Sequence, residues 1–375
     1  MLNFKHKTFM EVTSADFSSP VRQSIAKSSK IVSCFFKDDS VISLDGSTVV
    51  KLDKNSKPMF NSKLNCKGIV IPQQVPSSFH NALKILSEKG LVIFYETDNL
   101  SISSNINDFC ENFMYRLTPY LTEYELDRLS VSNKRKFYEN LTNYPSVSVV
   151  LCTNRLPNLD FIVPQIMNQI YPNFEIIFVN HGSDAKKFSE KIQILMENKP
   201  SATYRIFNAE KTLTFGESLS LGARASSGDF VAKFDDDDFY SAYHLLDIVR
   251  PTLANDFAIV GKSLNYVYIE PLDTTFIKKS TTSTGSSEHL SDWVAGGTML
   301  INKDFGDKVS WFSAVEHGVD RDIQDKALSL KLPIYRTHGA GYVYSRTNNN
   351  HTWSTNWQRY MAGSSHQVSG VYGNF

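Results

Sequence analysis

The sequence predicts an α/β protein whose central sheet is mostly parallel, preceded by a smaller α/β domain. Residues 147–152 and 174–179 are continuous apolar runs separated by a helical segment. Uninterrupted apolar strands are typical of parallel sheets that are covered on both faces. A third run, 230–234, leads into four consecutive aspartates, 235–238. Because ligands bind outside the carboxyl ends of parallel strands, the polar residues at these strand ends indicate a binding site.

Composition limits the classes of protein that fit. A length of 375 residues favours two domains, which we expect at 1–143 and 144–375. The 39 Lys and Arg residues balance the 39 Asp and Glu residues, which argues against a nucleic-acid-binding protein. The four cysteines form no C-x-x-C pair, so we expect a reduced, cytoplasmic chain without a zinc cluster. No apolar run approaches the ~20 residues that span a bilayer, so any membrane association would be peripheral, at the inner face of the cell membrane.

The N-terminal part has the pattern of a small α/β domain. Short β-type runs are found at 31–36, 41–44, 48–52, 68–72 and 91–95. Helices are expected at 77–89 and 106–141. This part contains neither a glycine-rich loop nor an acid cluster. We therefore expect an accessory domain that binds a partner, or a second copy in a homo-oligomer, rather than a second active site.

The elements before the aspartates follow the order of an α/β domain. Asn158 or Asp160 begins the helix after the first strand, with Pro164 near its first turn, where a missing N–H is tolerated. A helix at 214–228 has small residues on one side. Its glycines permit close packing, and a phosphate cradle is the weaker alternative because the sequence has neither a Walker A motif nor a dinucleotide fingerprint.

The four aspartates are the strongest sign of chemistry. On an extended segment, side chains two apart share a face, so Asp235 and Asp237 would converge while Asp236 and Asp238 face away. Two carboxylates ~4 to 7 Å apart repel each other by roughly 2 to 4 kcal/mol at an effective dielectric near 20. A divalent cation with a preference for oxygen ligands, Mg²⁺ or Mn²⁺, would relieve this repulsion. The alternative is a solvated charge run in a loop.

Later segments add further candidates. A strand is expected at 258–262, and a mobile polar loop at 274–288. Gly296 and Gly297 precede a β run, where glycines let the backbone approach a ligand closely or simply form a tight turn. An acidic segment, 316–322, opens a helix, and its acids either serve chemistry or cap the helix.

In their order and spacing, residues 147–155, 180–183, 216–228 and 235–238 resemble motifs of bacterial family 2 glycosyltransferases with the GT-A fold. This is a Rossmann-like, nucleotide-sugar-binding fold, and the resemblance extends from about 145 to 355. It implies transfer of a sugar from a nucleotide diphosphate sugar, a UDP-sugar in the first place, to a hydroxyl of a glycan or glycoconjugate. It also implies a Mn²⁺ or Mg²⁺ cofactor, inversion at the anomeric carbon, and a part in surface polysaccharide synthesis.

The resemblance assigns roles to individual residues. The metal ligands would be Asp237, Asp235 and His351. The residues bordering the donor nucleotide would be Thr153, Asn154, Arg155, Asn180, His181, Lys233, Asp235 and Asp236. The residues near the donor and acceptor sugars would be Trp293, Gly296, Gly297, Glu316 and Trp353, the last within a C-terminal His-Thr-Trp tail. Asp320 would be the catalytic base that takes the proton of the acceptor hydroxyl, with Asp322 or Glu316 as alternatives.

Two departures from the family pattern leave alternatives open. Asn180 and His181 replace the aspartate that usually reads uracil, so the base of the donor is in doubt. Val319 replaces an acid that usually precedes the catalytic aspartate, which gives weight to a non-catalytic nucleotide- or glycan-binding module. A nucleotidyltransferase is the other alternative, although residues 153–157 lack the glycine-rich, basic loop expected of that class.

Overall fold

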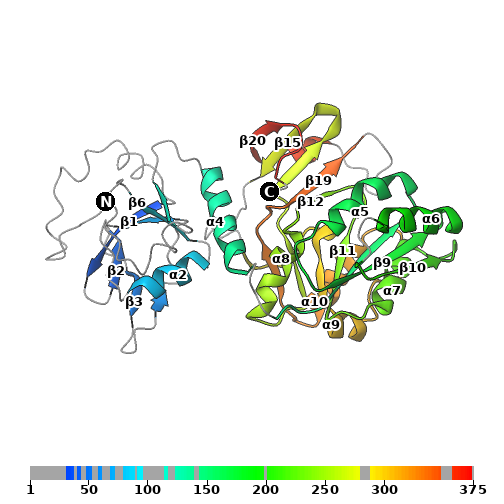
Figure 1. Ribbon diagram of the computed structural model, residues 1–375, viewed down its shortest axis with the longest axis horizontal. Helices are drawn as coiled ribbons and strands as arrows, with labels where there is room; N and C mark the ends of the chain where they lie inside the picture. Colours follow the sequence, from blue (N-terminus) through cyan, green and yellow to red (C-terminus); the bar gives the residue numbers. More distant parts are fainter. Residues whose placement is uncertain are drawn as a thin grey trace. The chain divides into compact units, whose positions relative to one another are not determined.

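The computed structural model describes residues 31–37, 40–43, 48–52, 58–60, 68–71, 79–88, 91–95, 114–116, 123–138, 143–197, 201–278, 288–347 and 357–373. The chain forms two compact units, Met1–Asn140 and Leu141–Phe375. Each unit has at least one β-sheet and its own helices (Figure 1). Within the described residues, no helix has the length and apolar character needed to cross a membrane.

The first unit contains a seven-stranded sheet in the order β4-β3-β2-β1-β5-β6-β7. Its strands are β1 (Ile31–Lys37), β2 (Ser40–Ser43), β3 (Thr48–Leu52), β4 (Pro58–Phe60), β5 (Gly68–Val70), β6 (Val92–Tyr95) and β7 (Met114–Arg116). The first four pair antiparallel, whereas β1, β5, β6 and β7 pair parallel. The apolar residues of β5 and β6 are buried, which accounts for the β-type runs in the sequence.

The described helices of the first unit are α2 (His80–Glu88) and α4 (Glu123–Tyr138). The buried side chain of Asn133 on α4 donates a hydrogen bond of 3.0 Å to Ser87 on α2. The predicted helix at 106–141 is wrong at Met114–Arg116, which forms β7. Parallel pairing with β6 supplies backbone hydrogen bonds there, and spaced charges and aromatic residues do not reveal such pairing.

The second unit contains an eight-stranded sheet in the order β10-β9-β8-β11-β17-β13-β18-β16. Its strands are β8 (Val147–Thr153), β9 (Phe174–His181), β10 (Tyr204–Ala209), β11 (Phe230–Phe234), β13 (Ile259–Lys262), β16 (His289–Leu290), β17 (Leu300–Asn302) and β18 (Ile334–Thr337). The block β10-β9-β8-β11 is parallel throughout, and β13 and β18 are also parallel. The predicted α/β class with a mostly parallel sheet is therefore confirmed.

Helices cover both faces of this sheet. They are α5 (Leu159–Met167), α6 (Ala185–Met196), α7 (Phe215–Ala225), α8 (His244–Val249), α9 (Lys303–Lys308) and α10 (Val319–Ser329). Figure 1 shows α5 and α6 on one side of the sheet and α7, α9 and α10 on the other. On the latter side, residues of β8 and β9 share one apolar core with Leu219 of α7 and Ile323 of α10.

The glycines of α7 allow the helix to lie close to the sheet. A Cβ atom at Gly222 would lie 2.7 Å from Val179 Cγ2 and 2.8 Å from Val150 Cγ1. The helix begins with a capping box in which the side chains of Thr214 and Glu217 each accept a hydrogen bond from the other's backbone N–H. Of the two roles considered for the glycines of this helix, close packing and a phosphate cradle, Gly222 has the first.

A second, five-stranded sheet in this unit has the order β12-β19-β14-β15-β20. Its strands are β12 (Phe239–Tyr240), β14 (Tyr266–Ile269), β15 (Thr274–Lys278), β19 (Tyr342–Arg346) and β20 (Ser364–Ser369), and the short helix α11 (Trp357–Met361) precedes β20. The prediction of a mobile loop at 274–288 is wrong for Thr274–Lys278. Thr275, Phe276 and Ile277 are buried there and pair with β14 and β20.

Two local predictions also need correction. Pro164 is the sixth residue of α5, which begins at Leu159, so it lies in the second turn of the helix and not in the first. The side chain of Asn158 makes no capping hydrogen bond. Strand β10 was not predicted, since its residues, among them Arg205 and Asn208, lie at a sheet edge and are largely half-buried.

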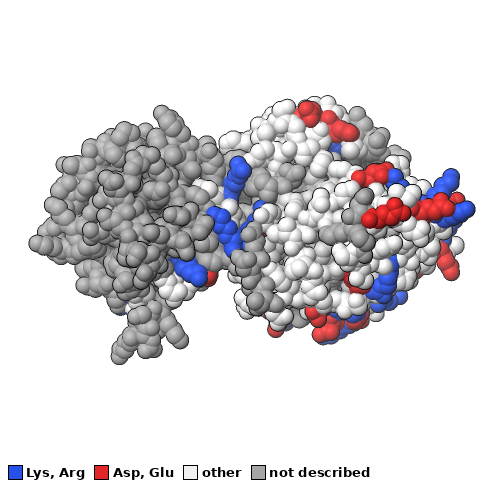
Figure 2. All heavy atoms as spheres, viewed as in Figure 1, with Lys and Arg blue, Asp and Glu red and all other residues white. Residues whose placement is uncertain are grey.

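Charges at the surface near α6 are mixed in sign. Figure 2 shows acidic and basic side chains side by side there. Lys191 forms an ion pair of 2.5 Å with Asp160, and Lys186 lies 3.8 Å from Glu190. The described residues around α6 therefore form no extended basic surface of the kind that nucleic acid requires.

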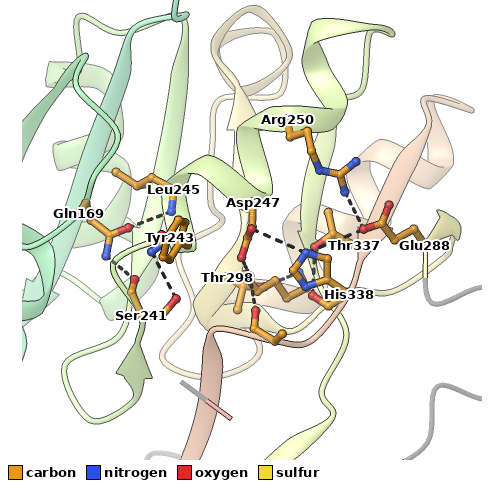
Figure 3. A network of polar contacts seen from close by, with 12 residues as sticks. Gln169, Ser241, Tyr243, Leu245, Asp247, Arg250, Glu288, Thr298, Thr337 and His338 are labelled. Carbon is orange, nitrogen blue, oxygen red and sulfur yellow. Dashed lines mark hydrogen bonds and ion pairs between the residues drawn. The ribbon is translucent and has the colours of Figure 1, made fainter. Parts of the chain in front are cut away.

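A network of buried polar side chains lies in the interior of the second unit (Figure 3). Lys262 of β13 pairs with Asp247 of α8 at 2.6 Å and also donates to the backbone oxygen of Ala340. Arg250 pairs with Glu288 at 2.6 Å. The backbone N–H of Lys262 donates to Thr298 Oγ1 at 2.8 Å, which connects this network to the Gly296-Gly297 segment.

Candidate active site

A cleft of about 1320 Å³ lies at the carboxyl ends of β8, β9 and β11, and the five-stranded sheet supplies residues to its wall. The structure brings most of the predicted site residues together here. Those that line the cleft are Thr153, Asn154, Arg155, His181, Lys233, Asp235, Asp236, Asp237, Trp293, Gly296, Gly297, Glu316 and Asp320. Segments far apart in the sequence therefore meet at one place, as expected for the carboxyl ends of parallel strands.

Asn180 is not among the residues that line the cleft. Its amide group donates to Ser183 O and to Asn208 Oδ1, both at 3.0 Å, and its oxygen accepts from the N–H and hydroxyl of Ser183. These bonds stabilise the turn after β9, in which Gly182 has a φ of 89°. The side chain of Asn180 thus fixes the turn, and His181 next to it faces the cleft.

Asp322 also lies away from the cleft lining. Its carboxylate accepts hydrogen bonds from the N–H of Ser313 at 2.9 Å and from the Ser313 hydroxyl at 2.8 Å, and it lies 3.1 Å from Lys326 Nζ. Burial raises the pKa of this carboxyl, but these bonds outweigh burial and lower the pKa. Of the two predicted catalytic acids, Asp320 alone lines the cleft.

His351 and Trp353, together with the rest of 348–356, lie outside the described residues. The predicted metal-binding role of His351 and the sugar contact of Trp353 therefore stay predictions. The segment before them is described: Thr347 follows β19 and lines the cleft.

Arg155 ties the end of β8 to the aspartates. Its guanidinium forms a two-pronged pair with Asp236, through Nη2 and through Nε at 3.0 Å, and its Nη1 lies 3.1 Å from Asp237 Oδ2. Thr153 donates its hydroxyl to the same Asp236 carboxylate. Asp236 is buried, while about a third of the Arg155 side chain, 37%, is exposed. Asp236 therefore holds Arg155 at the cleft wall.

The aspartates form a turn between β11 and β12, so strand alternation does not apply to them. The carboxylate of Asp236 contacts Thr153 and Arg155, and the prediction that Asp238 faces away from Asp235 is wrong. A Cβ atom at Gly297 would lie 2.7 Å from Asp235 Oδ2 and 3.0 Å from Asp238 Oδ2, so both carboxylates face the same small space. Asp238 also accepts hydrogen bonds from the Tyr342 hydroxyl at 2.6 Å and from Ser345 N–H at 2.8 Å.

Lys233 joins Asp235 to the candidate base. Its buried ammonium lies 2.5 Å from Asp235 Oδ1 and 3.1 Å from Asp320 Oδ1. Although burial lowers the pKa of Lys233, the two carboxylates outweigh burial and raise it well above its usual range. A Cβ atom at Gly296 would overlap the Asp320 carboxylate. Glycine is therefore needed at this position for Asp320 to keep its place.

The acid turn carries charge that the protein compensates only in part. The pKa of Asp235 is raised to about 6, chiefly by burial; Lys233 opposes this rise, and the neighbouring Asp320 and Asp237 contribute to it. Burial also raises the pKa of Asp238 well above its usual range, with Asp237 and Asp235 adding to the effect. A cation at this turn would favour the ionised carboxylates.

The donor atoms at this turn fit Mg²⁺ or Mn²⁺. No group of three His, Cys, Asp or Glu side chains among the described residues could hold a metal ion on its own. Mg²⁺ is usually bound through one or two carboxylates together with substrate phosphates and water. Asp235 and Asp237, in a cleft large enough for a nucleotide sugar, meet that requirement when phosphate oxygens complete the shell.

His181 lies at the end of the cleft formed by β9 and α7. Its ring is 5.7 Å from the ring of Phe215, and burial lowers its pKa, with the nearby carboxylate of Glu316 opposing this effect. Glu316 also accepts a hydrogen bond of 3.2 Å from Phe215 N–H. These aromatic and polar groups could contact a base or ribose.

Several cleft residues were not among the predicted site residues. They include Phe215, Lys278, Tyr342, Tyr344, Arg346 and Tyr360. Tyr240, which is buried and does not line the cleft, was also not predicted. It accepts from Asp235 N–H and donates to Gly297 O, both at 2.8 Å, and so joins the acid turn to the glycine pair. The sequence signal for Tyr240 is its position two residues after the acid run. The residues of the five-stranded sheet become neighbours only through strand pairing that sequence spacing does not encode.

The mostly parallel sheet and the acid turn at its carboxyl edge define an α/β domain with its cleft where such folds bind ligands. Residues 148–321 match the model of glycosyl transferase family 2. In this region, which is less than half of the chain, the chain is similar to glycosyl transferase family 2.

Two curated relatives are uncharacterized glycosyltransferases. One from Haemophilus influenzae is 32% identical over 131 residues, which are 35% of this chain and 40% of the relative. YwdF of Bacillus subtilis is 28% identical over 178 residues, which are 46% of this chain and 63% of the relative. The chain thus spans between about two fifths and two thirds of the length of these relatives.

Two solved structures are also similar. A mannosyltransferase, PcManGT from Pyrobaculum calidifontis, in complex with GDP-Man and Mn²⁺, has a TM-score of 0.39 and 15% identity, with 55% of this chain and 56% of that chain covered. TarS of S. aureus in complex with UDP-GlcNAc has a TM-score of 0.44 and 14% identity, with 56% and 61% covered.

Proposed function

We propose that the chain is a metal-dependent, inverting glycosyltransferase that moves a sugar from a nucleotide diphosphate sugar to a hydroxyl of a glycan or glycoconjugate. The observation that carries this proposal is the placement of Asp320. It lines the same cleft as the acid turn and is joined to Asp235 through Lys233. One carboxylate group would then lie beside the leaving diphosphate, and another would be available for the incoming hydroxyl.

The donor would bind along the carboxyl ends of β8, β9 and β11. His181 and Phe215 would border the base or ribose, with Thr153 and Asn154 at the neighbouring strand end. Arg155 presents a guanidinium, partly exposed, that is suited to phosphate. A UDP-sugar remains our first candidate, and Asn180, whose side chain is used within its own turn, gives no argument for a particular base.

Asp235 and Asp237 would hold Mn²⁺ or Mg²⁺ together with the donor phosphates, with His351 as a further candidate ligand. When bound, such an ion neutralises the charge that develops on the departing nucleoside diphosphate. Lys233 keeps Asp235 in position and adds positive charge next to it. No separate protein acid is then needed for the leaving group.

Asp320 would act as the base. Its Oδ1 is engaged with Lys233, while its Oδ2 lies beside the open position at Gly296. An oxygen held in this way can accept the proton of an acceptor hydroxyl as that hydroxyl attacks the anomeric carbon. Trp293 and Glu316, which also line the cleft, would border the sugars.

The biological setting proposed is bacterial surface polysaccharide synthesis in the cytoplasm, with the first unit as an accessory domain. The test is calorimetric titration of the full chain with UDP-, GDP-, CMP- and dTDP-sugars, with and without Mn²⁺, in parallel with Asp237→Ala. We expect metal-dependent binding of one nucleotide sugar that the variant loses. If none of them binds at millimolar concentration in either condition, the transferase proposal is wrong.

A further inference from the structure

The wall of the cleft on the five-stranded sheet contains a group of residues that the proposed reaction does not use. We call Lys278, Tyr344, Arg346 and Tyr360 the basic-aromatic corner. They come from β15, β19 and α11, and all four line the same cleft as Asp320. Two of them are cations, and the other two present aromatic rings to those cations.

Arg346 is the centre of this corner. Only 3% of it is exposed. Its Cζ atom lies 4.6 Å from the centre of the Tyr344 ring and 4.8 Å from the centre of the Tyr360 ring, and its Nη2 donates to the Tyr360 hydroxyl. The two rings therefore hold the guanidinium plane in a fixed orientation.

The charge of Arg346 has no carboxylate partner within the described part of the chain. The ion pairs there include none to Arg346, and its buried Nε–H has no hydrogen-bond acceptor among the described residues. Lys278 adds a second positive charge, with its Nζ 5.9 Å from the centre of the Tyr360 ring. A buried cation is costly unless an anion accompanies it, so this arrangement favours an anion that enters from the cleft.

Two observations favour the acceptor over the donor as the source of that anion. The donor site proposed above lies at the strand ends of the eight-stranded sheet, where Arg155 and the acid turn with its metal already suit a diphosphate. The corner belongs to the other sheet. In addition, Tyr344, Arg346 and Tyr360 all follow the region 148–321 that matches the family, so they are candidates for what distinguishes this chain's substrate.

We propose that the basic-aromatic corner binds the anionic group, phosphate or carboxylate, of an acidic glycan acceptor. This inference rests on the proposed function and names the class of its acceptor. A phosphate or carboxylate can accept paired hydrogen bonds from a guanidinium whose plane is fixed by stacking. Leu264, which lines the cleft and packs near Tyr344 and Tyr360, suits the C–H face of the attached sugar ring.

The test uses an array of glycans that carry phosphate or uronic acid groups, each matched with its neutral counterpart. The full chain is applied with Mn²⁺ and UDP or GDP, and nucleotide-sugar binding is measured separately by calorimetry. We expect the acidic glycans to bind about tenfold more tightly than the neutral ones. Arg346→Gln and Lys278→Gln should each remove most of that preference while leaving nucleotide-sugar affinity within about twofold.

Lys186→Gln is the matched control, because Lys186 is exposed on α6 and is not among the residues that line the cleft. Lys278→Gln keeps the test valid if Arg346→Gln fails to fold. Equal binding of neutral and acidic glycans, or binding of neither, would overturn the inference. An equal loss of nucleotide-sugar affinity in both variants would also overturn it, since the corner would then serve the donor diphosphate. If the unaltered chain binds no nucleotide sugar, the proposed function itself has failed.

Discussion

At the scale of single residues, the site separates two acids that the sequence could not distinguish. Asp320 and Asp322 lie two positions apart on α10, and both were candidate bases. Because a helix turns by about 100° per residue, side chains two apart point in different directions. Asp320 consequently faces Lys233 and the cleft, whereas Asp322 faces Ser313 and Lys326.

We expect Asp320→Asn to lower kcat by roughly 10²- to 10⁴-fold, the usual loss when a general base is removed. Affinity for the nucleotide sugar should change little, because the acid turn and Arg155 remain. Steady-state kinetics with a nucleotide sugar and its acceptor, combined with calorimetry for the donor, will measure the two effects. Asp322→Asn is the matched control and should keep most of its kcat. A larger loss in Asp322→Asn than in Asp320→Asn would assign the base to Asp322.

Asp322 should instead contribute to stability in a pH-dependent manner. Its folded-state pKa lies below the unfolded value because Ser313 and Lys326 favour the ionised form. The unfolded state therefore binds the proton more readily, and the stabilisation is present above the unfolded pKa of ~3.9 and is lost as the pH falls through the folded pKa. Urea unfolding at several pH values should show a smaller decrease at acidic pH for Asp322→Asn than for the unaltered chain. Identical pH profiles would contradict this prediction.

At the scale of elements, sequence patterns predicted the strands and helices whose buried residues recur at a regular spacing. Strands β8, β9 and β11, helix α7 and the start of α10 are found where apolar runs, small residues and acids indicated them. The acid turn itself was found by the density of its charges. The patterns failed for β7, β10 and β15, whose assignment depends on pairing with neighbouring strands. The basic-aromatic corner could not be predicted for the same reason, since Lys278, Arg346 and Tyr360 are brought together by that pairing.

The close packing of α7 on the sheet gives a prediction for this element. Replacing Gly222 with Ala places a Cβ atom 2.7 Å from Val179 Cγ2 and 2.8 Å from Val150 Cγ1, so the helix must move away from the strands. We expect a loss of about 1 to 3 kcal/mol in the free energy of unfolding, as is usual for overpacked cores. Chemical denaturation will measure it. Arg224→Ala, at an exposed position of the same helix, is the control and should change stability by less than about 0.5 kcal/mol.

At the scale of the whole molecule, the buried network of Figure 3 connects the core of the second unit to its cleft. Lys262 and Asp247 are almost fully buried and lie 2.6 Å apart. The backbone of Lys262 also binds both Thr298 and Ala295, on either side of the glycine pair. The position of Gly296 beside Asp320 thus depends on a charge pair deep in the core.

Removing one charge of this pair should therefore affect folding strongly. We expect Asp247→Asn to cost about 3 to 5 kcal/mol, because the Lys262 ammonium would stay buried with its countercharge removed. Urea unfolding of the full chain will measure this loss. Glu190→Gln, which removes an exposed partner 3.8 Å from Lys186, is the comparison and should cost no more than about 1 kcal/mol. Similar losses in the two variants would show that Asp247 and Lys262 do not act as a buried pair.

The division of the chain gives the last prediction. Every described residue that lines the cleft comes from the second compact unit, Leu141–Phe375, and that unit has its own core and its own two sheets. Binding of the donor requires the carboxyl ends of β8, β9 and β11, and all of these strands belong to this unit. We therefore expect a fragment of residues 141–375 to fold and to bind the nucleotide sugar with an affinity within about threefold of the full chain, a difference of less than 1 kcal/mol. Calorimetry on the fragment and the full chain, with circular dichroism to establish folding, will measure this difference in affinity.

If the folded fragment loses donor affinity by about tenfold or more, the first unit contributes to the donor site and is not an accessory domain. If affinity is kept while transfer to an acceptor is lost, the first unit acts on the acceptor, which would give it a defined part in the reaction.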